Sequence, residues 1–135
     1  MTTVDPHAFD FWIGEWDVHD PEGRPVGHNS VTPLYGTGAL AEHWHGNGGV
    51  EGHSLNAWDP ERGCWHQTWV DSSGSVLLLD GGVHDGAMVL EGIDADTRQR
   101  ITWSVEADGV RQHWESSKDD GETWTTAFDG RYRRA

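Results

Sequence analysis

The chain has 135 residues, which fits one domain, and we expect residues 1–135 to form it. Its 23 acidic residues outnumber its 9 basic residues, the formal net charge is −14, and Lys118 is the only lysine. Recognition of phosphates requires clustered Lys and Arg. This composition therefore argues against nucleic acid and against an anionic membrane surface as partners.

Cys64 is the only cysteine, which excludes an internal disulfide. The first residues contain no apolar run typical of a signal peptide, and no stretch approaches the ~18 apolar residues of a membrane helix. We therefore expect a cytoplasmic protein of bacterial type. Hydrophobic residues make up only 35% of the chain, with nine tryptophans, so the core must consist largely of big rings.

A short helical turn is expected at residues 5–11, where Asp5 can cap it and Pro6 takes the first helical position. Beyond it, Gly and Asp recur in turn-forming groups, and no segment between them sustains a helical periodicity over three turns. Ten strands are predicted, near residues 12–19, 26–35, 39–46, 51–58, 64–71, 75–80, 86–93, 100–106, 110–116 and 123–132.

Short strands at regular spacing, joined by turns, are typical of an all-β sandwich or barrel. Every connection is short enough to be a hairpin, so we expect an antiparallel meander. Ten strands in one open sheet would leave exposed edges, and closure removes them. The predicted fold is an antiparallel up-and-down β-barrel of about ten strands.

Side chains of a barrel strand alternate between the interior and the solvent, so the tryptophans indicate which face points inward. In residues 64–71, Trp65 and Trp69 share their face with Gln67 and Asp71. The same argument places Trp44 and Glu42 inside, with His43 and His45 outside.

Two further strands carry tryptophans on their predicted inner faces. Trp103 points inward with Ile101 and Val105, and Trp114 points inward with Gln112. Residues 52–59 leave two alternatives open, because Ser54, Asn56 and Trp58 oppose His53, Leu55 and Ala57.

The inferred interior therefore combines aromatic walls with a few polar side chains. Buried carboxylates are costly unless they are paired or hydrogen-bonded, whereas an aromatic cavity with convergent polar groups is typical of a small-molecule site. The alternative is that Glu42 and Asp71 lie solvated at the barrel mouth or bond to buried backbone groups.

Gly14, Glu15 and Trp16 resemble the G-x-W signature of lipocalins and related calycin barrels. In those barrels the Trp closes one end, and an Arg from the last strand stacks on it. The resemblance implies this role for Trp16, with Arg131 or Arg133 supplying the cation–π contact.

Longer motifs resemble an uncharacterised bacterial family, a domain of unknown function that opens with F-D-F-W-x-G-x-W. The likeness covers nearly the whole chain and implies a calycin-like barrel, without a settled activity. The matching segments are FDFWIGEWDV at 9–18, ALAEHW at 39–44, WHQTWVDSSG at 65–74, SSKDDGETW at 116–124 and FDGRY at 128–132.

Residues 117–124 fit the Asp-box pattern S-x-D-x-G-x-T-W, which sialidases carry as a hairpin brace. In that pattern Ser117 and Asp119 bond to the turn backbone, Gly121 supplies the turn and Trp124 packs beneath it. We interpret the motif as structural, since one copy does not indicate a sialidase.

Nine histidines raise the question of a metal. His43 and His45 share one face of a strand, as metal ligands do, but that face is predicted outside. His53 or His66 could complete a ligand set only if their strands neighbour it. We therefore expect no metal site and no cofactor. Haem is the less favoured alternative, since it needs an axial His that faces inward, and the ligand segment of nitric-oxide-binding haem barrels has no placed counterpart here.

The leading functional hypothesis is the binding of a small apolar or aromatic molecule inside the barrel. The rival is a cofactor-free cyclase, isomerase or dehydratase acting on a polyketide-like or aromatic substrate, with Glu42 and Asp71 as general acid and base. The predicted ligand-binding residues are Trp12, Trp44, Ser54, Gln67, Trp69, Trp103, Gln112 and Trp114.

A third possibility leaves the tryptophans as core and places the function at a protein interface. Residues 76–80 are apolar on both faces, which favours a homodimer contact on one side. Nucleophilic catalysis has little support, because there is no G-x-S-x-G turn and Cys64 is predicted to point outward.

Overall fold

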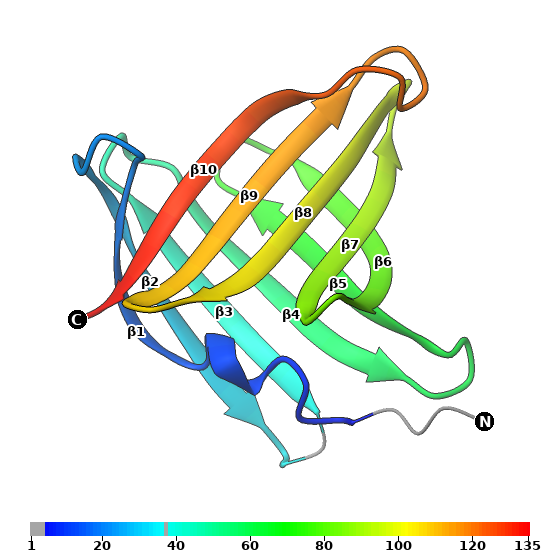
Figure 1. The fold of residues 1–135 in the computed structure, drawn as a ribbon, viewed down its shortest axis with the longest axis horizontal. Helices are drawn as coiled ribbons and strands as arrows, with labels where there is room; N and C mark the ends of the chain where they lie inside the picture. Colours follow the sequence, from blue (N-terminus) through cyan, green and yellow to red (C-terminus); the bar gives the residue numbers. More distant parts are fainter. Residues whose placement is uncertain (1–4, 37) are drawn as a thin grey trace.

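The computed structural model of the chain describes residues 5–36 and 38–135, and it forms a closed barrel of ten antiparallel strands (Figure 1). Each strand pairs with its neighbours in sequence, and β1 pairs with β10 to close the barrel. The predicted fold class is confirmed. The elements are η1 (Asp10–Trp12), β1 (Gly14–His19), β2 (Pro25–Leu34), β3 (Ala39–Gly46), β4 (Glu51–Asp59), β5 (Cys64–Asp71), β6 (Val76–His84), β7 (Ala87–Asp94), β8 (Thr97–Glu106), β9 (Gly109–Ser117) and β10 (Thr125–Arg134).

Most of the strands are joined by short turns of the kind that the Gly and Asp groups predict. Between β6 and β7, Asp85 and Gly86 have φ angles of 51° and 80°. Two consecutive positive φ angles define the type I′ turn, whose twist matches that of the flanking strands. None of the helices among the described residues is long and apolar enough to cross a bilayer.

An aromatic plug fills the end of the barrel at which η1 lies (Figure 1). The ring of Phe9 lies 5.0 Å from that of Trp12, 5.1 Å from that of Trp103 and 5.9 Å from that of Trp65, between ring centroids. Phe9, Trp12 and Trp103 are fully shielded from solvent. These rings account for much of the hydrophobic core of a chain that has few aliphatic residues.

The G-x-W segment adjoins this plug. Trp16 is buried, and its indole N–H donates to the backbone carbonyl of Trp12 at 2.9 Å. The guanidinium of Arg134 lies 4.1 Å above the Trp16 ring, and it also donates to the carbonyl of Ile13 at 2.8 Å. The prediction that Arg131 or Arg133 makes this contact is wrong. Those two side chains pair with Glu106 instead.

Buried and exposed residues alternate along the strands. At the end of a strand, beyond the barrel wall, an inward position can be exposed as well. Ile101 and Trp103 are buried, but Val105 is 63% exposed near the end of β8, which corrects its predicted inward place. In β4 the structure selects Ser54 and Asn56 as the inner face and leaves Leu55 exposed. The barrel wall shields side chains only along its own height.

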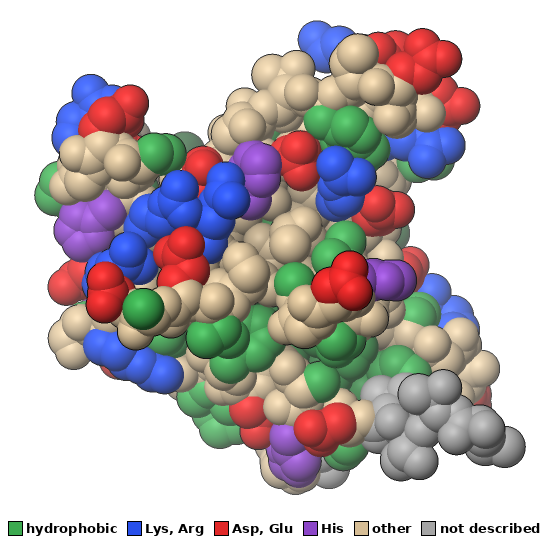
Figure 2. Space-filling model, viewed as in Figure 1, with side chains coloured by type: hydrophobic (Ala, Val, Ile, Leu, Met, Phe, Trp, Pro, Cys, Tyr) green, Lys and Arg blue, Asp and Glu red, His purple; other side chains and the backbone are tan. Residues whose placement is uncertain are grey.

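The outer surface is mixed. Arginine and acidic side chains alternate over β8–β10 (Figure 2), with ion pairs such as Arg111 to Asp129 at 2.9 Å. Within β6, Val76 and Leu78 are exposed while Leu77 and Leu79 are buried, so the segment is apolar on both faces. The homodimer contact on this segment stays a prediction.

Candidate ligand-binding site

The candidate site is a cavity of about 210 Å³ at the end of the barrel opposite the aromatic plug. Figure 2 shows the surface hollowed at this end, between the β1–β2 turn and the β9–β10 turn. An engineered cavity of about 150 Å³ holds one benzene molecule, so this volume suits a ligand with a single ring. The lining residues are Glu42, Trp44, Val50, Gln67, Trp69, Asp71, Leu77, Ile101, Gln112, Trp114, Ala127 and Phe128.

Glu42 is the buried acid of this cavity. The hydroxyl of Ser54 donates to its Oε1 at 2.6 Å, and the amide of Asn29 donates to its Oε2 at 2.8 Å. Burial raises the pKa of Glu42 to about 6, although the two hydrogen bonds oppose the shift. The carboxyl group is therefore able to exchange a proton close to neutral pH.

One arm of a hydrogen-bond network runs from Glu42 across β4 and β5. Asn56 donates to the hydroxyl of Ser54 at 2.8 Å, and Gln67 donates to the side-chain oxygen of Asn56 at 2.7 Å. The strand register produces this arm, because Ser54 lies directly opposite Glu42 and Gln67 lies directly opposite Asn56. Every donor in the arm points toward Glu42, and the arm ends at the cavity wall.

The second arm runs from Glu42 through β2 and β10. Asn29 donates its other amide hydrogen to the hydroxyl of Tyr132 at 2.9 Å, and Tyr132 donates to the side-chain oxygen of Gln112 at 2.7 Å. No hydrogen bond within the described residues uses the amide nitrogen of Gln112, which lines the cavity. Both arms therefore end in a glutamine at the cavity, and both originate at one carboxyl group.

Asp71 sits at the mouth and has a different environment. Its Oδ2 accepts the indole N–H of Trp69 at 2.9 Å, while its Oδ1 accepts bonds from Ser73 and from the backbone of Ser75. Partial burial acts to raise the pKa of Asp71, but these hydrogen bonds outweigh it and lower the pKa. Asp71 is thus an ionised group that holds Trp69 and the β5–β6 turn, and no hydrogen bond among the described residues joins it to Glu42.

Glycines on neighbouring strands make room for the wall tryptophans. A Cβ atom at Gly52 would lie 2.2 Å from the ring of Trp69, and one at Gly27 would lie 2.5 Å from the ring of Trp44. Each ring therefore lies flat against a strand that has no side chain at that point. A larger residue at either glycine would push the neighbouring indole away from the wall.

Seven of the ten site residues that the sequence predicts line this cavity. Ser54 stands behind Glu42 as its hydrogen-bond donor. Trp12 and Trp103 belong to the plug at the other end, which corrects the prediction that they form ligand-binding walls. The seven that line the cavity are Glu42, Trp44, Gln67, Trp69, Asp71, Gln112 and Trp114.

Sequence reasoning missed Asn29, Tyr132 and Phe128. Alternation along Gly27, Asn29 and Val31, and along Phe128, Gly130 and Tyr132, was the available signal. Neither strand contains a tryptophan that would indicate which of its two faces points inward, so the alternation alone was a weaker signal than in the strands that contain one.

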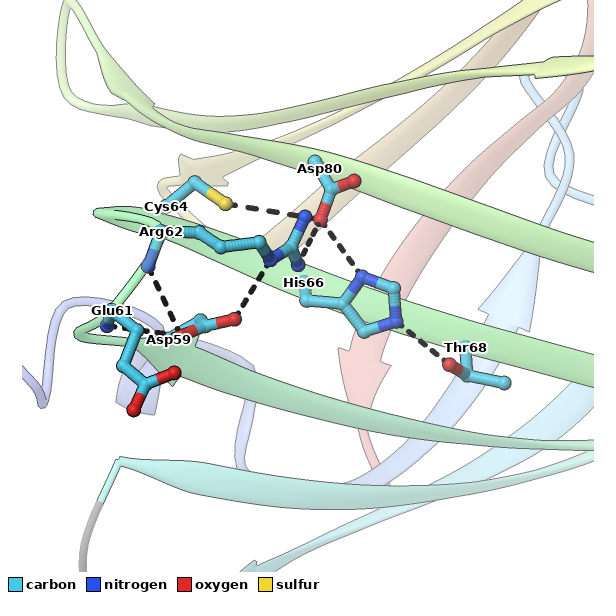
Figure 3. Close-up of polar contacts among 7 residues, drawn as sticks. All are labelled: Asp59, Glu61, Arg62, Cys64, His66, Thr68 and Asp80. Atoms are coloured by element: carbon cyan, nitrogen blue, oxygen red, sulfur yellow. Dashed lines mark hydrogen bonds and ion pairs between the residues drawn. The ribbon is translucent and has the colours of Figure 1, made fainter.

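A second polar cluster lies on the outside of β5 and β6 (Figure 3). Arg62 donates to Asp80 Oδ1 at 2.8 Å, His66 contacts the same oxygen at 2.8 Å, and Cys64 approaches it at 3.8 Å. Burial raises the pKa of the Cys64 thiol, with the Asp80 charge adding to the shift. Since Cys64 and His66 both face Asp80 rather than each other, the cluster braces the β4–β5 turn and lacks an activated thiolate.

Histidines are absent from the cavity wall as the structure describes it. All nine lie in the described residues, and none is buried. The cavity therefore presents no imidazole to a haem iron.

The Asp-box segment forms the brace that its pattern predicts. Asp119 accepts bonds from the hydroxyl of Thr123, from the backbone N–H of Thr123 at 2.8 Å and from the hydroxyl of Ser117 at 2.7 Å, and these bonds lower its pKa to about 2. Trp124 donates to the carbonyl of Gly121 at 3.1 Å and lies beneath the guanidinium of Arg100. The hydrogen bonds stay within residues 117–124, and the contact with Arg100 ties the loop to β8.

No protein-family model matches the chain, and no curated protein matches it either. The barrel is compatible with a lipocalin-like fold. The resemblance to the family that opens with F-D-F-W-x-G-x-W stays a prediction.

Proposed function

We propose that the barrel binds a small, largely apolar or aromatic molecule at its open end. The ring of the ligand lies among Trp44, Trp69 and Trp114, and its polar group meets Glu42 and the two glutamines. The observation that carries this proposal is a fully buried carboxyl group on the wall of an otherwise aromatic cavity. Such a combination is characteristic of small-molecule sites, because the apolar walls supply affinity and a few polar groups supply orientation.

The hydrogen-bond donors and acceptors that the network leaves unused define the preferred ligand. Gln112 has its amide nitrogen available to donate, and the carboxyl group of Glu42 accepts when ionised. A ligand that carries an acceptor next to a donor satisfies both groups. A single aromatic ring with a carboxamide or a hydroxy-carbonyl group has this chemistry and the right size.

Native mass spectrometry of freshly purified protein, compared with its denatured mass, tests the proposal first. Tryptophan fluorescence titrations with benzamide, phenol and indole then follow. We expect saturable binding of benzamide that weakens at least tenfold in Gln112→Ala and remains unchanged in Glu61→Gln, a control on the exposed β4–β5 turn. A bare mass together with no binding of any of the three probes would overturn the proposal.

The raised pKa of Glu42 favours a second candidate, cofactor-free acid–base catalysis of a cyclisation, isomerisation or dehydration. A carboxyl group whose pKa is about 6 takes and returns a proton readily near neutral pH. Asp71 is engaged by Trp69 and Ser73, so in this candidate it orients the wall and Glu42 alone moves the proton. With a substrate identified, Glu42→Gln should abolish turnover and change affinity only modestly, whereas a pure carrier shows no turnover to lose.

A further inference from the structure

Three imidazoles and one carboxylate lie close together on the outer face of the β3–β4 hairpin. In the strand register His43 lies opposite His53, and His45 lies opposite Glu51. The rings of His43 and His45 are 4.0 Å apart between centroids, and the rings of His43 and His53 are also 4.0 Å apart and nearly parallel. Cross-strand neighbours on one face come this close because of strand geometry alone.

The ligand-capable atoms of His43, His45 and Glu51 all lie within 4.8 Å of one another. In a tetrahedral zinc site the ligand atoms are about 3.3 Å apart, since Zn–N and Zn–O bonds are roughly 2.0–2.2 Å long. Small side-chain rotations therefore bring the three atoms to bonding distance. We propose that these three residues bind one divalent transition-metal ion, with Zn²⁺ as the representative.

The arrangement and the accessibility of the ligands suit this role. Glu51 is hydrogen-bonded to His43, so a carboxylate oxygen and an imidazole nitrogen already lie side by side. The backbone of Glu51 is anchored to Ser72 by two hydrogen bonds, of 2.8 and 2.9 Å. His43 and Glu51 remain 37% and 52% exposed as side chains, so an ion can reach them from solvent.

The two Zn–ligand bonds replace the hydrogen bond between His43 and Glu51. A neutral imidazole binds the ion through one ring nitrogen and carries its proton on the other, so no proton has to leave and no oxidation is involved. His53 stacks on His43 and holds its ring, so we assign it a positioning role. Two imidazoles and one carboxylate leave a fourth coordination position for water.

Isothermal titration of Zn²⁺ into EDTA-treated, dialysed protein tests this site, and Co²⁺ titration followed by visible absorption reports the coordination number. We expect one ion per chain and a Co²⁺ spectrum typical of four-coordination. His43→Ala and Glu51→Gln should each weaken binding at least tenfold. His53→Ala should weaken it less than His43→Ala does.

His28→Ala is the matched control. His28 lies on the neighbouring strand β2, opposite His45, but its ring nitrogens face Glu15 and Asp17. This variant should bind Zn²⁺ like the wild type. Zn²⁺ should also raise the midpoint of thermal unfolding in the wild type and in His28→Ala, but not in Glu51→Gln. Absence of binding, a stoichiometry other than one, or equal loss in His28→Ala would overturn the site. These outcomes are independent of ligand binding in the cavity.

Discussion

Glu42 is the single residue on which the interior chemistry depends. Its pKa is about 6 in the folded chain and 4.5 when unperturbed, because burial penalises the charged form. The folded chain therefore holds this proton more tightly than the unfolded chain does. The contribution of Glu42 to stability is most favourable below pH 4.5 and declines as pH rises through 6.

We expect this decline to amount to roughly 2 kcal/mol, since one pKa unit corresponds to about 1.4 kcal/mol. Urea denaturation at several pH values should show the free energy of unfolding of the wild type falling by that amount relative to Glu42→Gln. The comparison removes the effect of the other carboxylates, which both proteins share. Glu61→Gln should follow the wild type, and a Glu42→Gln difference that does not vary with pH would contradict the shifted pKa.

At the scale of elements, strands that carry the wall rings depend on glycines in the strands beside them. A Cβ at Gly52 would meet the ring of Trp69 at 2.2 Å, so Gly52→Ala must displace the indole from its hydrogen bond with Asp71. We expect a loss of about 1–3 kcal/mol, the usual cost of overpacking. A shift in the tryptophan emission spectrum should accompany the loss of stability in urea.

Gly48→Ala is the control for this substitution, because a Cβ at Gly48 meets nothing within 4 Å. It should leave both the urea midpoint and the emission spectrum close to those of the wild type. Equal destabilisation by the two substitutions would show that the space beside Trp69 is not the cause.

The β9–β10 loop contains the Asp-box brace, whose role can also be tested. Asp119 bonds to Ser117 and Thr123, which lowers its pKa to about 2, so its stabilising effect is present above pH 3.8 and is lost as pH falls through 2. Lys118, the only lysine, lies within this loop. A lysine-specific protease should therefore cut Asp119→Ala several-fold faster than the wild type at neutral pH.

Glu122→Ala provides the comparison within the same loop. The Glu122 side chain is exposed and makes no hydrogen bond among the described residues. Its rate of cleavage should match that of the wild type. A wild-type rate in Asp119→Ala as well would contradict the role of the Asp box as a brace.

At the scale of the whole molecule, the stabilising aromatic plug and the candidate ligand cavity lie at opposite ends of the barrel. The plug at the closed end is built around Phe9, which is shielded from solvent and touches the rings of Trp12, Trp65 and Trp103. Phe9→Ala should reduce the free energy of unfolding by about 3–5 kcal/mol in urea. Phe11→Ala, at a half-buried neighbour, should cost clearly less.

This separation also predicts the effect on binding. If Phe9→Ala still folds at low temperature, its affinity for a cavity ligand should stay near that of the wild type, because no plug ring lines the cavity. A tenfold loss of affinity would show that the two ends are coupled.

The fold class, the ten strands and the inward placement of Glu42, Gln67 and Gln112 could all be predicted from the sequence. These follow from local rules, since turn residues and a two-residue alternation operate within a single strand and need no knowledge of its neighbours. The tryptophans revealed the alternation wherever a strand contains one. Strands β2 and β10 have no inward tryptophan, so the inward positions of Asn29 and Tyr132 were not predicted.

Which inward residues lie at the same height in the barrel became known from the three-dimensional structure alone. Trp103 points inward along β8, but its height along the barrel places it in the plug, and Trp12 lies in η1 rather than in a strand. Arg134, rather than Arg131 or Arg133, covers Trp16 because of the register between β1 and β10. The grouping of His43 with Glu51 likewise depends on cross-strand pairing. The β1–β10 register arises from pairing between strands that are distant in sequence, and the other registers depend on the geometry of the turns, so the alternation within a single strand does not encode them.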